Sequence, residues 1–139
     1  MSWDPNLKKY ITRSRNKAKR FKDDIDMAQM IRYGNELIRI NAQQNTIEYS
    51  RDGRNGLTRC KNVSLGTFLD LVDFGGQIMA CTSKGVFSSK DKGQNWHVCC
   101  KTGAYGEFLQ LAVDGPNLLA STSKGVYYSK DGGHNWHRR

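Results

Sequence analysis

The chain has 139 residues, of which 37% are hydrophobic and 25% are charged, and its formal net charge is +9. This length suits one domain with a modest hydrophobic core. No stretch approaches the ~20 consecutive apolar residues of a membrane-spanning helix, and no apolar run follows the charged N-terminus, which argues against a secretory signal. The sequence therefore predicts a cytoplasmic protein without a membrane span.

The first segment, residues 1–25, is expected to form an α-helix. Asp4 is a suitable N-cap and Pro5 a suitable first helical residue, so the helix should run from about Pro5 to Asp23. Side chains at roughly helical spacing form a narrow stripe: Leu7, Tyr10, Ile11, Ser14, Ala18 and Phe21. The stripe can dock on the rest of the chain, which leaves the remaining faces of the helix in solvent.

Those remaining faces are strongly basic. Within fifteen residues the segment contains no acid but carries eight cations: Lys8, Lys9, Arg13, Arg15, Lys17, Lys19, Arg20 and Lys22. Such a face is either simply solvated or binds an acidic partner. No nucleic-acid-binding motif accompanies it, so nucleic acid is the least favoured partner.

The rest of the chain, residues 26–139, consists of three repeats. Phe68–His97 and Phe108–His137 match at a constant offset of 40 residues, and a diverged copy spans Met27–Asn55. Within the last copy, strands are expected at Phe108–Val113, Leu118–Thr122, Val126–Ser129 and Asn135–Arg138, separated by turn residues. Four strands in about 40–45 residues is the period of a propeller blade. The fold class is therefore mainly β, with three four-stranded blades after a basic helix.

Each repeat ends in a similar string, Ser-x-Asp-x-Gly-x-x-Trp, whose spaced Asp and Gly are typical of a hairpin turn. The string resembles the Asp box, or BNR repeat, of sialidases, sortilin-type receptors, photosystem assembly factors and other β-propellers. That resemblance implies a mainly structural hairpin between the third and fourth strands, at the periphery of a blade. The candidate structural residues are Ser89, Asp91, Gly93, Trp96, Ser129, Asp131, Gly133 and Trp136, together with Ser50 and Asp52 of the diverged copy. In that copy either Gly53 or Arg54 takes the place of the spaced glycine, and Gly56-Leu57 stands where the tryptophan is expected.

No catalytic, metal or cofactor site is predicted. A sialidase needs an arginine cluster, a tyrosine nucleophile assisted by a glutamate, and an aspartic acid. No motif assigns such roles here, and the glutamates are Glu36, Glu48 and Glu107 alone. The histidines, His97, His134 and His137, are expected in structural or solvated positions. The cysteines, Cys60, Cys81, Cys99 and Cys100, form no C-x-x-C pair and are expected to be small buried residues.

Three blades are fewer than the four to eight of a closed propeller. A second copy would complete six blades and cover the open ends, so a homodimer is expected. Capping of one end by the N-terminal helix is the alternative. The sequence thus predicts a non-enzymatic binding or assembly module, such as a small neutralising or scaffold protein. Its expected partner is a protein, for which an acidic surface is one option, or a glycan. The competing hypothesis is a glycan-processing, sialidase-like hydrolase whose site is assembled across an oligomer.

Overall fold

The computed structural model describes residues 30–61 and 63–139. These residues form two compact units that divide after Lys61, and each unit is described by itself. The expected N-terminal helix, its cations from Lys8 to Lys22 and the domain boundary at residue 25 lie outside the described residues. Within the described residues, no helix is long and apolar enough to cross a membrane.

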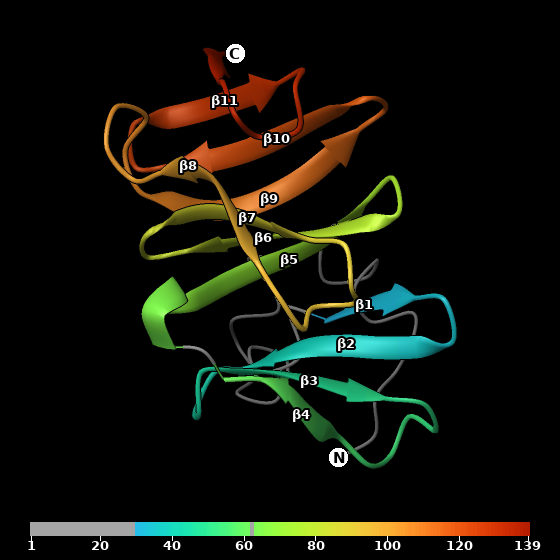
Figure 1. The fold of residues 1–139 in the computed structure, drawn as a ribbon. Coiled ribbons are helices and arrows are strands. Elements are labelled where there is room, and N and C mark those ends of the chain that lie inside the picture. Colours follow the sequence, from blue (N-terminus) through green and yellow to red (C-terminus); the bar gives the residue numbers. More distant parts are fainter. Residues whose placement is uncertain (1–29, 62) are drawn as a thin grey trace, which may run out of the picture. The chain divides into compact units, whose positions relative to one another are not determined.

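The first unit is one four-stranded antiparallel sheet, called sheet 1 (Figure 1). Its strands follow chain order: β1 (Met30–Tyr33), β2 (Glu36–Asn41), β3 (Thr46–Ser50) and β4 (Leu57–Cys60). Tight turns join neighbouring strands, so each strand pairs with the next along the chain. This is the meander expected of one blade.

The second unit contains two more sheets of the same kind, after a short 3-10 helix η1 (Val63–Leu65). Sheet 2 comprises β5 (Phe68–Phe74), β6 (Gln77–Thr82), β7 (Gly85–Ser89) and β8 (His97–Lys101). Sheet 3 comprises β9 (Phe108–Asp114), β10 (Asn117–Thr122), β11 (Gly125–Ser129) and β12 (His137–Arg138). The predicted fold class of three four-stranded sheets is confirmed, and the first three predicted strands of the last repeat agree within one residue at each end. The fourth begins at His137 rather than Asn135, because Asn135 belongs to the preceding turn.

Sheets 2 and 3 pack face to face around one hydrophobic core. Successive residues of a strand point to opposite faces, so each sheet contributes every second residue. Sheet 2 contributes Val72, Met79, Cys81 and Val86, and sheet 3 contributes Phe108, Leu111, Leu118, Ala120, Tyr127 and Trp136. None of these side chains is more than 9% exposed. The second and third repeats therefore supply the two sheet faces of this contact.

In sheets 2 and 3, a repeated loop closure orders the end of the sheet at which the second strand turns into the third. The Ser83 N–H donates to the Thr67 carbonyl over 3.0 Å, and the Ser83 hydroxyl accepts from the Thr67 N–H over 2.9 Å. Ser123 and Glu107 form the same pair in sheet 3, with both distances 2.9 Å. Each closure places the following lysine, Lys84 or Lys124, in an exposed turn.

One carboxylate lies inside the core between sheets 2 and 3. Asp70, on β5, has no exposed surface. Its Oδ1 accepts from the Leu71 N–H over 3.0 Å, and its Oδ2 accepts from the Leu111 N–H of β9 over 2.9 Å. Asp70 therefore joins the first strands of two neighbouring sheets by a buried hydrogen bond.

We expect Asp70→Ala to lower the free energy of unfolding by about 1–3 kcal/mol, because the Leu111 N–H loses this acceptor inside the core. Urea-induced unfolding, followed by circular dichroism, measures the loss. Asp73→Ala is the matched control, since it makes the same change at an exposed position of the same strand, and it should change stability by no more than about 0.5 kcal/mol. Equal losses in the two variants would contradict a special role for Asp70.

Candidate functional site

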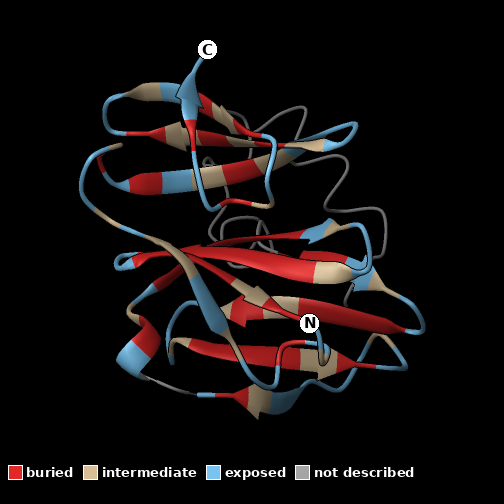
Figure 2. Cartoon of the chain, turned by 45° about the horizontal axis from the view of Figure 1, so that its top comes forward, coloured by how far each residue is buried: buried red, intermediate tan, exposed pale blue. Residues whose placement is uncertain are grey.

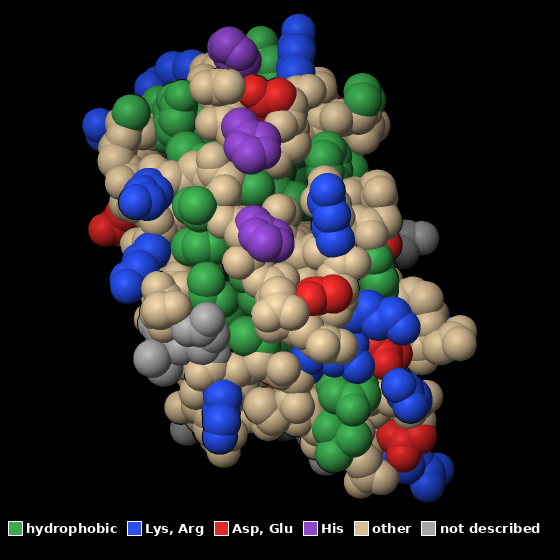
Figure 3. All heavy atoms as spheres, viewed as in Figure 1, with side chains coloured by type: hydrophobic (Ala, Val, Ile, Leu, Met, Phe, Trp, Pro, Cys, Tyr) green, Lys and Arg blue, Asp and Glu red, His purple; other side chains and the backbone are tan. Residues whose placement is uncertain are grey.

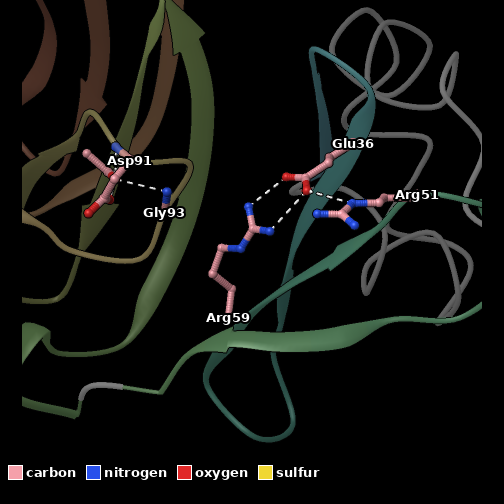
Figure 4. Close-up of polar contacts among 6 residues, drawn as sticks. Glu36, Arg51, Arg59, Asp91 and Gly93 are labelled. Atoms are coloured by element: carbon pink, nitrogen blue, oxygen red, sulfur yellow. Dashed lines mark hydrogen bonds and ion pairs between the residues drawn. The ribbon is translucent and has the colours of Figure 1, made fainter.

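The predicted structural residues meet in three hairpin turns, called here the Ser-Asp turns (residues 50–55, 89–95 and 129–135). In the second turn, the Ser89 hydroxyl donates to Asp91 Oδ1 over 2.8 Å and accepts from the Gly93 N–H over 2.9 Å. Asn95 donates to Asp91 twice, from its backbone N–H over 2.8 Å and from Nδ2 over 2.7 Å. The aspartate therefore serves as the acceptor of its own turn (Figure 4).

The third turn repeats this geometry in sheet 3. Ser129 donates to Asp131 over 2.7 Å, and Asn135 donates from its N–H and Nδ2 over 2.9 and 2.7 Å. Gly133 has a φ of 95°, in the region that favours glycine. A Cβ placed there would also lie 3.3 Å from Met79 Cε and 3.4 Å from Val86 Cγ1. Glycine is thus needed both for the turn and for close contact with sheet 2.

The first turn keeps the same hydrogen bonds although it is one residue shorter. Asp52 Oδ1 accepts from the Ser50 hydroxyl over 3.0 Å and from the Asn55 N–H over 2.9 Å. The Gly53 N–H donates to the Ser50 hydroxyl over 3.0 Å, and its φ is 75°. Gly53, rather than Arg54, therefore takes the place of the spaced glycine.

Sequence reasoning missed the asparagine of each turn. Asn55, Asn95 and Asn135 all donate to the aspartate of their turn from both the backbone and the side chain. The available signal was the recurrence of Asn at the end of all three strings. The motif therefore has a fifth member, an asparagine, beside its Ser, Asp, Gly and Trp.

These hydrogen bonds hold the aspartates in the ionised form. Burial alone would raise the pKa of Asp91, but the hydrogen bonds from Asn95 and Ser89 lower it to about 2. The Asn135 backbone N–H holds the pKa of Asp131 well below its usual range, and the Asn55 N–H does the same for Asp52. Carboxylates in this state are poor proton donors near neutral pH, so the turns are suited to hold structure rather than to transfer protons.

The two tryptophans fold back over their turns. Trp96 Nε1 donates to the Gly93 carbonyl over 2.9 Å, and Trp136 Nε1 donates to the Gly133 carbonyl over the same distance. The Trp136 ring lies 5.3 Å from that of Phe108 and is only 4% exposed. The indoles thus connect a turn to the hydrophobic core.

We expect Trp136→Ala to cost about 3–5 kcal/mol of stability, because it empties a packed site of the core. Thermal unfolding measures the loss. Trp96→Ala is the matched control in sheet 2; its indole makes the equivalent hydrogen bond but is less buried, so the loss should be smaller. A Trp136→Ala protein that melts like the parent would contradict the structural role.

We also expect an acid dependence from the second Ser-Asp turn. A carboxyl whose pKa falls from 3.8 when unfolded to about 2 when folded stabilises the fold fully above pH 3.8. That stabilisation is lost as the pH falls towards 2. The difference in stability between the parent and Asp91→Asn should therefore be largest above about pH 5 and shrink between pH 4 and 2. Denaturant unfolding across this pH range checks it, and a difference that is independent of pH would refute it.

Sheet 1 carries a buried ion cluster that sequence reasoning did not find. Glu36, 3% exposed, accepts from Arg59 Nη1 over 2.6 Å, from Arg59 Nη2 over 3.0 Å and from Arg51 Nε over 3.2 Å (Figure 4). The Arg59 guanidinium also lies 3.7 Å from the centre of the Tyr49 ring. Burial opposes the charge of Arg59, but its hydrogen bonds to Glu36 raise its pKa. The cluster ties β2 to β4 across β3.

A second ion pair lies in the same sheet. Glu48 accepts from Arg39 Nε over 2.9 Å and from Asn41 Nδ2 over 3.0 Å. Two of the three glutamates of the chain, Glu36 and Glu48, are therefore engaged by side chains of their own sheet. This arrangement favours a structural role for both over a role in catalysis.

The strongest candidate for a binding site is a hollow in the second unit, at the end where the Ser83 closure lies. Its volume is about 570 Å³. The lining residues are Ser64, Ser83, Lys84, Phe87, Val98, Lys101 and Thr102. Lys84 Nζ donates to the Ser64 carbonyl over 3.2 Å, and Thr102 Oγ1 donates to the Ser83 carbonyl over 3.3 Å. The hollow thus has an apolar wall, hydroxyl groups and two cations.

The same end of the second unit is basic beyond the hollow. Lys124 lies in the β10–β11 turn, and the Arg138 guanidinium lies beside Gly125 in that turn. In Figure 3, Lys and Arg side chains follow the left-hand edge of the upper part of the view, where these turns lie in Figure 1. The name "basic end" is used below for Lys84, Lys101, Lys124 and Arg138.

A smaller hollow of about 300 Å³ lies between β8 and the third Ser-Asp turn. Its lining includes Cys99, Asp131 and two of the histidines, His97 and His134. Figure 3 shows the histidine side chains in a row on one face. Burial raises the pKa of Cys99. Among the described residues, no group of three or more His, Cys, Asp or Glu could hold a metal ion.

Comparison with solved structures identifies the architecture. YCF48 from Cyanidioschyzon merolae is 21% identical with a TM-score of 0.63, over 78% of this chain and 35% of that one. A gluconolactonase-like protein is 13% identical with a TM-score of 0.59, over 74% and 43% of the two chains. BamB from Moraxella catarrhalis is 17% identical with a TM-score of 0.54, over 74% and 31%. These are β-propellers. The chain has a propeller-type fold.

The likeness is one of fold, and this chain spans less than half the length of each of these structures. No protein-family model matches the sequence. No curated protein matches it either.

Proposed function

We propose that the chain is a non-enzymatic binding or assembly module whose basic end receives an acidic segment of a partner protein. The observation that carries the proposal is the hollow at that end, whose lining combines Lys84 and Lys101 with Phe87 and Val98. Two cations beside an apolar wall suit a segment that inserts an apolar side chain between carboxylates. The basic residues 8–22, which lie outside the described residues, would add to this attraction.

The three Ser-Asp turns support the assignment of the chain to the Asp-box propellers. The second and third have the spaced Ser, Asp, Gly and Trp, and the first retains the hydrogen bonds after losing one residue. In this proposal the turns close the hairpins and leave partner binding to the opposite end of each sheet. That end is where the second strand turns into the third, whereas the Ser-Asp turns follow the third strand.

The proposal assigns no catalytic residue. Asp91 and Asp131 accept hydrogen bonds within their own turns, and Glu36 and Glu48 are paired with arginines. The alternative, a sialidase-like hydrolase, predicts turnover of sialyllactose by the purified protein, which our proposal does not expect.

Self-association is part of the proposal. Three sheets are fewer than a closed propeller needs, and a second copy would cover faces and edges that invite aggregation. We therefore expect a homodimer, and sedimentation equilibrium at micromolar concentration measures the mass against 15.8 kDa for one chain.

A labelled acidic peptide with a central leucine tests the basic end by fluorescence anisotropy. The double variant Lys84→Glu, Lys101→Glu should weaken binding roughly tenfold or more, since exposed charge pairs contribute up to ~1 kcal/mol each. It should also reduce the dependence of binding on salt. The matched control is Lys90→Glu, Lys130→Glu, which makes the same change of charge beside the Ser-Asp turns.

Binding that weakens equally in both double variants would mean attraction by net charge alone, and the proposed site would be wrong. Equal binding of sialyllactose and the acidic peptide, each lost in Lys84→Glu, Lys101→Glu, would instead favour a glycan as the partner.

A further inference from the structure

The face of sheet 3 that points away from sheet 2 is called here the outer face. Strand alternation and register place six residues at its centre, Gln110, Ala112, Leu119, Ser121, Val126 and Tyr128, and put Asp114, Asn117 and His137 at its margin. The strand register arranges the six in two rows. Ala112, Leu119 and Tyr128 lie opposite one another across β9, β10 and β11, as do Gln110, Ser121 and Val126. None of the six is charged at neutral pH.

The equivalent face of sheet 2 is covered in this structure. Its residues at the same repeat positions are Asp70, Val72, Met79, Cys81, Val86 and Ser88. Met79, Cys81 and Val86 have no exposed surface, because sheet 3 packs on them with Leu118 and Trp136 among others. In sheet 2, these repeat positions therefore form a face on which another sheet packs.

On sheet 3 the same positions are uncovered. Val126 is 46% exposed, whereas Val86 is fully buried. Ala112, Leu119 and Ser121 are half-buried, where their counterparts in sheet 2 are buried. Figure 2 shows the strands of sheet 2 largely in the buried colour, while those of sheet 3 alternate with exposed and intermediate residues. An apolar row on three paired strands is a surface from which a partner would remove water.

Residues on the opposite faces of the other two sheets are also buried. Ile78 of sheet 2 has no exposed surface, nor has Met30 of sheet 1, and Leu37 is 5% exposed. At the positions of Ala120 and Tyr127, sheet 1 carries Arg39 and Glu48, which form an ion pair. A head-to-tail contact would set this ion pair against Leu119 and Val126.

The outer face of a second copy, in contrast, has the same exposed and uncharged centre. Two such faces would meet through uncharged side chains, while the charged groups lie at the margin: Asp114 at the end of β9, and Lys130, whose Nζ is 5.9 Å from the centre of the Tyr128 ring. We propose that the outer face of sheet 3 packs against the same face of a second copy across a twofold axis. This inference rests on the proposed self-association and specifies its surface. The contact is a face-to-face packing of two sheets about 10 Å apart, which covers the open face of sheet 3 without closing a ring of blades.

Charge placed on the outer face tests the surface. Val126→Glu should convert the dimer to a monomer in sedimentation equilibrium, with an unchanged β-type circular dichroism spectrum. Leu119→Gln is a milder change in the other row and should weaken dimerisation at least tenfold. It tests the same surface if the Val126→Glu protein does not fold. Val113→Glu is the matched control: Val113 is 44% exposed on β9 but alternates onto the opposite face.

A single cysteine tests the twofold geometry. Ser121 lies on the central strand of the three, β10, so Ser121→Cys should form a disulfide with its own copy when oxidised by copper phenanthroline. The parent chain, with its four cysteines, and Val113→Cys should stay monomeric on a non-reducing gel after the same treatment.

Each outcome separates the two proposals. A monomeric parent overturns self-association and this surface together, while the acidic-peptide assay still decides the basic end. A dimer that survives both Val126→Glu and Leu119→Gln overturns the surface but not self-association. A dimer lost in those variants but not cross-linked through Ser121→Cys overturns the contact between two copies of the outer face. It favours head-to-tail closure instead, in which the outer face meets a different sheet face of the second copy.

Discussion

A hairpin turn has more backbone N–H groups than strand pairing can satisfy, and this chain meets that constraint with one aspartate per sheet. Asp91 accepts from the N–H and side chain of Asn95, and Ser89 connects Asp91 to the Gly93 N–H. With the turn closed in this way, Trp96 can donate to the Gly93 carbonyl and lie against the sheet. The placement of the third and fourth strands, and of the aromatic residue that covers them, depends on this small network.

Because the turn is satisfied locally, the faces of the sheets were free to diverge. Sheet 1 has the ion pair of Arg39 and Glu48 at positions where sheet 3 has Ala120 and Tyr127. This ion pair is partly buried, so removal of one partner leaves the other charge partly desolvated and without its counter-ion. A sheet face with such a pair therefore packs best on a partner that leaves the pair intact. A sheet face with apolar residues at the same positions can pack on any sheet of complementary shape.

The local features of this fold could be predicted from the sequence, and the long-range ones could not. Ser, Asp and Gly at fixed spacing within one hairpin predict the turns, and the repeat period predicts the four-stranded sheets. The hydrogen bond from Leu111 to Asp70 joins residues 41 positions apart, and Glu36 meets Arg59 over 23 positions. Neither pair leaves a local pattern. The basic end was missed for the same reason: Lys84 and Lys101, which line one hollow, are 17 positions apart in the sequence.

The arrangement separates three tasks on one repeat. The Ser-Asp turn follows the third strand, the lysine turn precedes it, and the faces between them bind neighbouring sheets. A change at Lys84 therefore alters charge without touching the hydrogen bonds of Asp91, since the two residues lie at opposite ends of β7. The turn between the second and third strands has a lysine in the second and third repeats, whereas the first repeat has Gln44 and Asn45 there. The Ser-Asp turn is nevertheless formed in all three repeats, because it lies at the other end of the third strand. Binding properties can consequently vary from repeat to repeat on a hairpin whose closure stays the same.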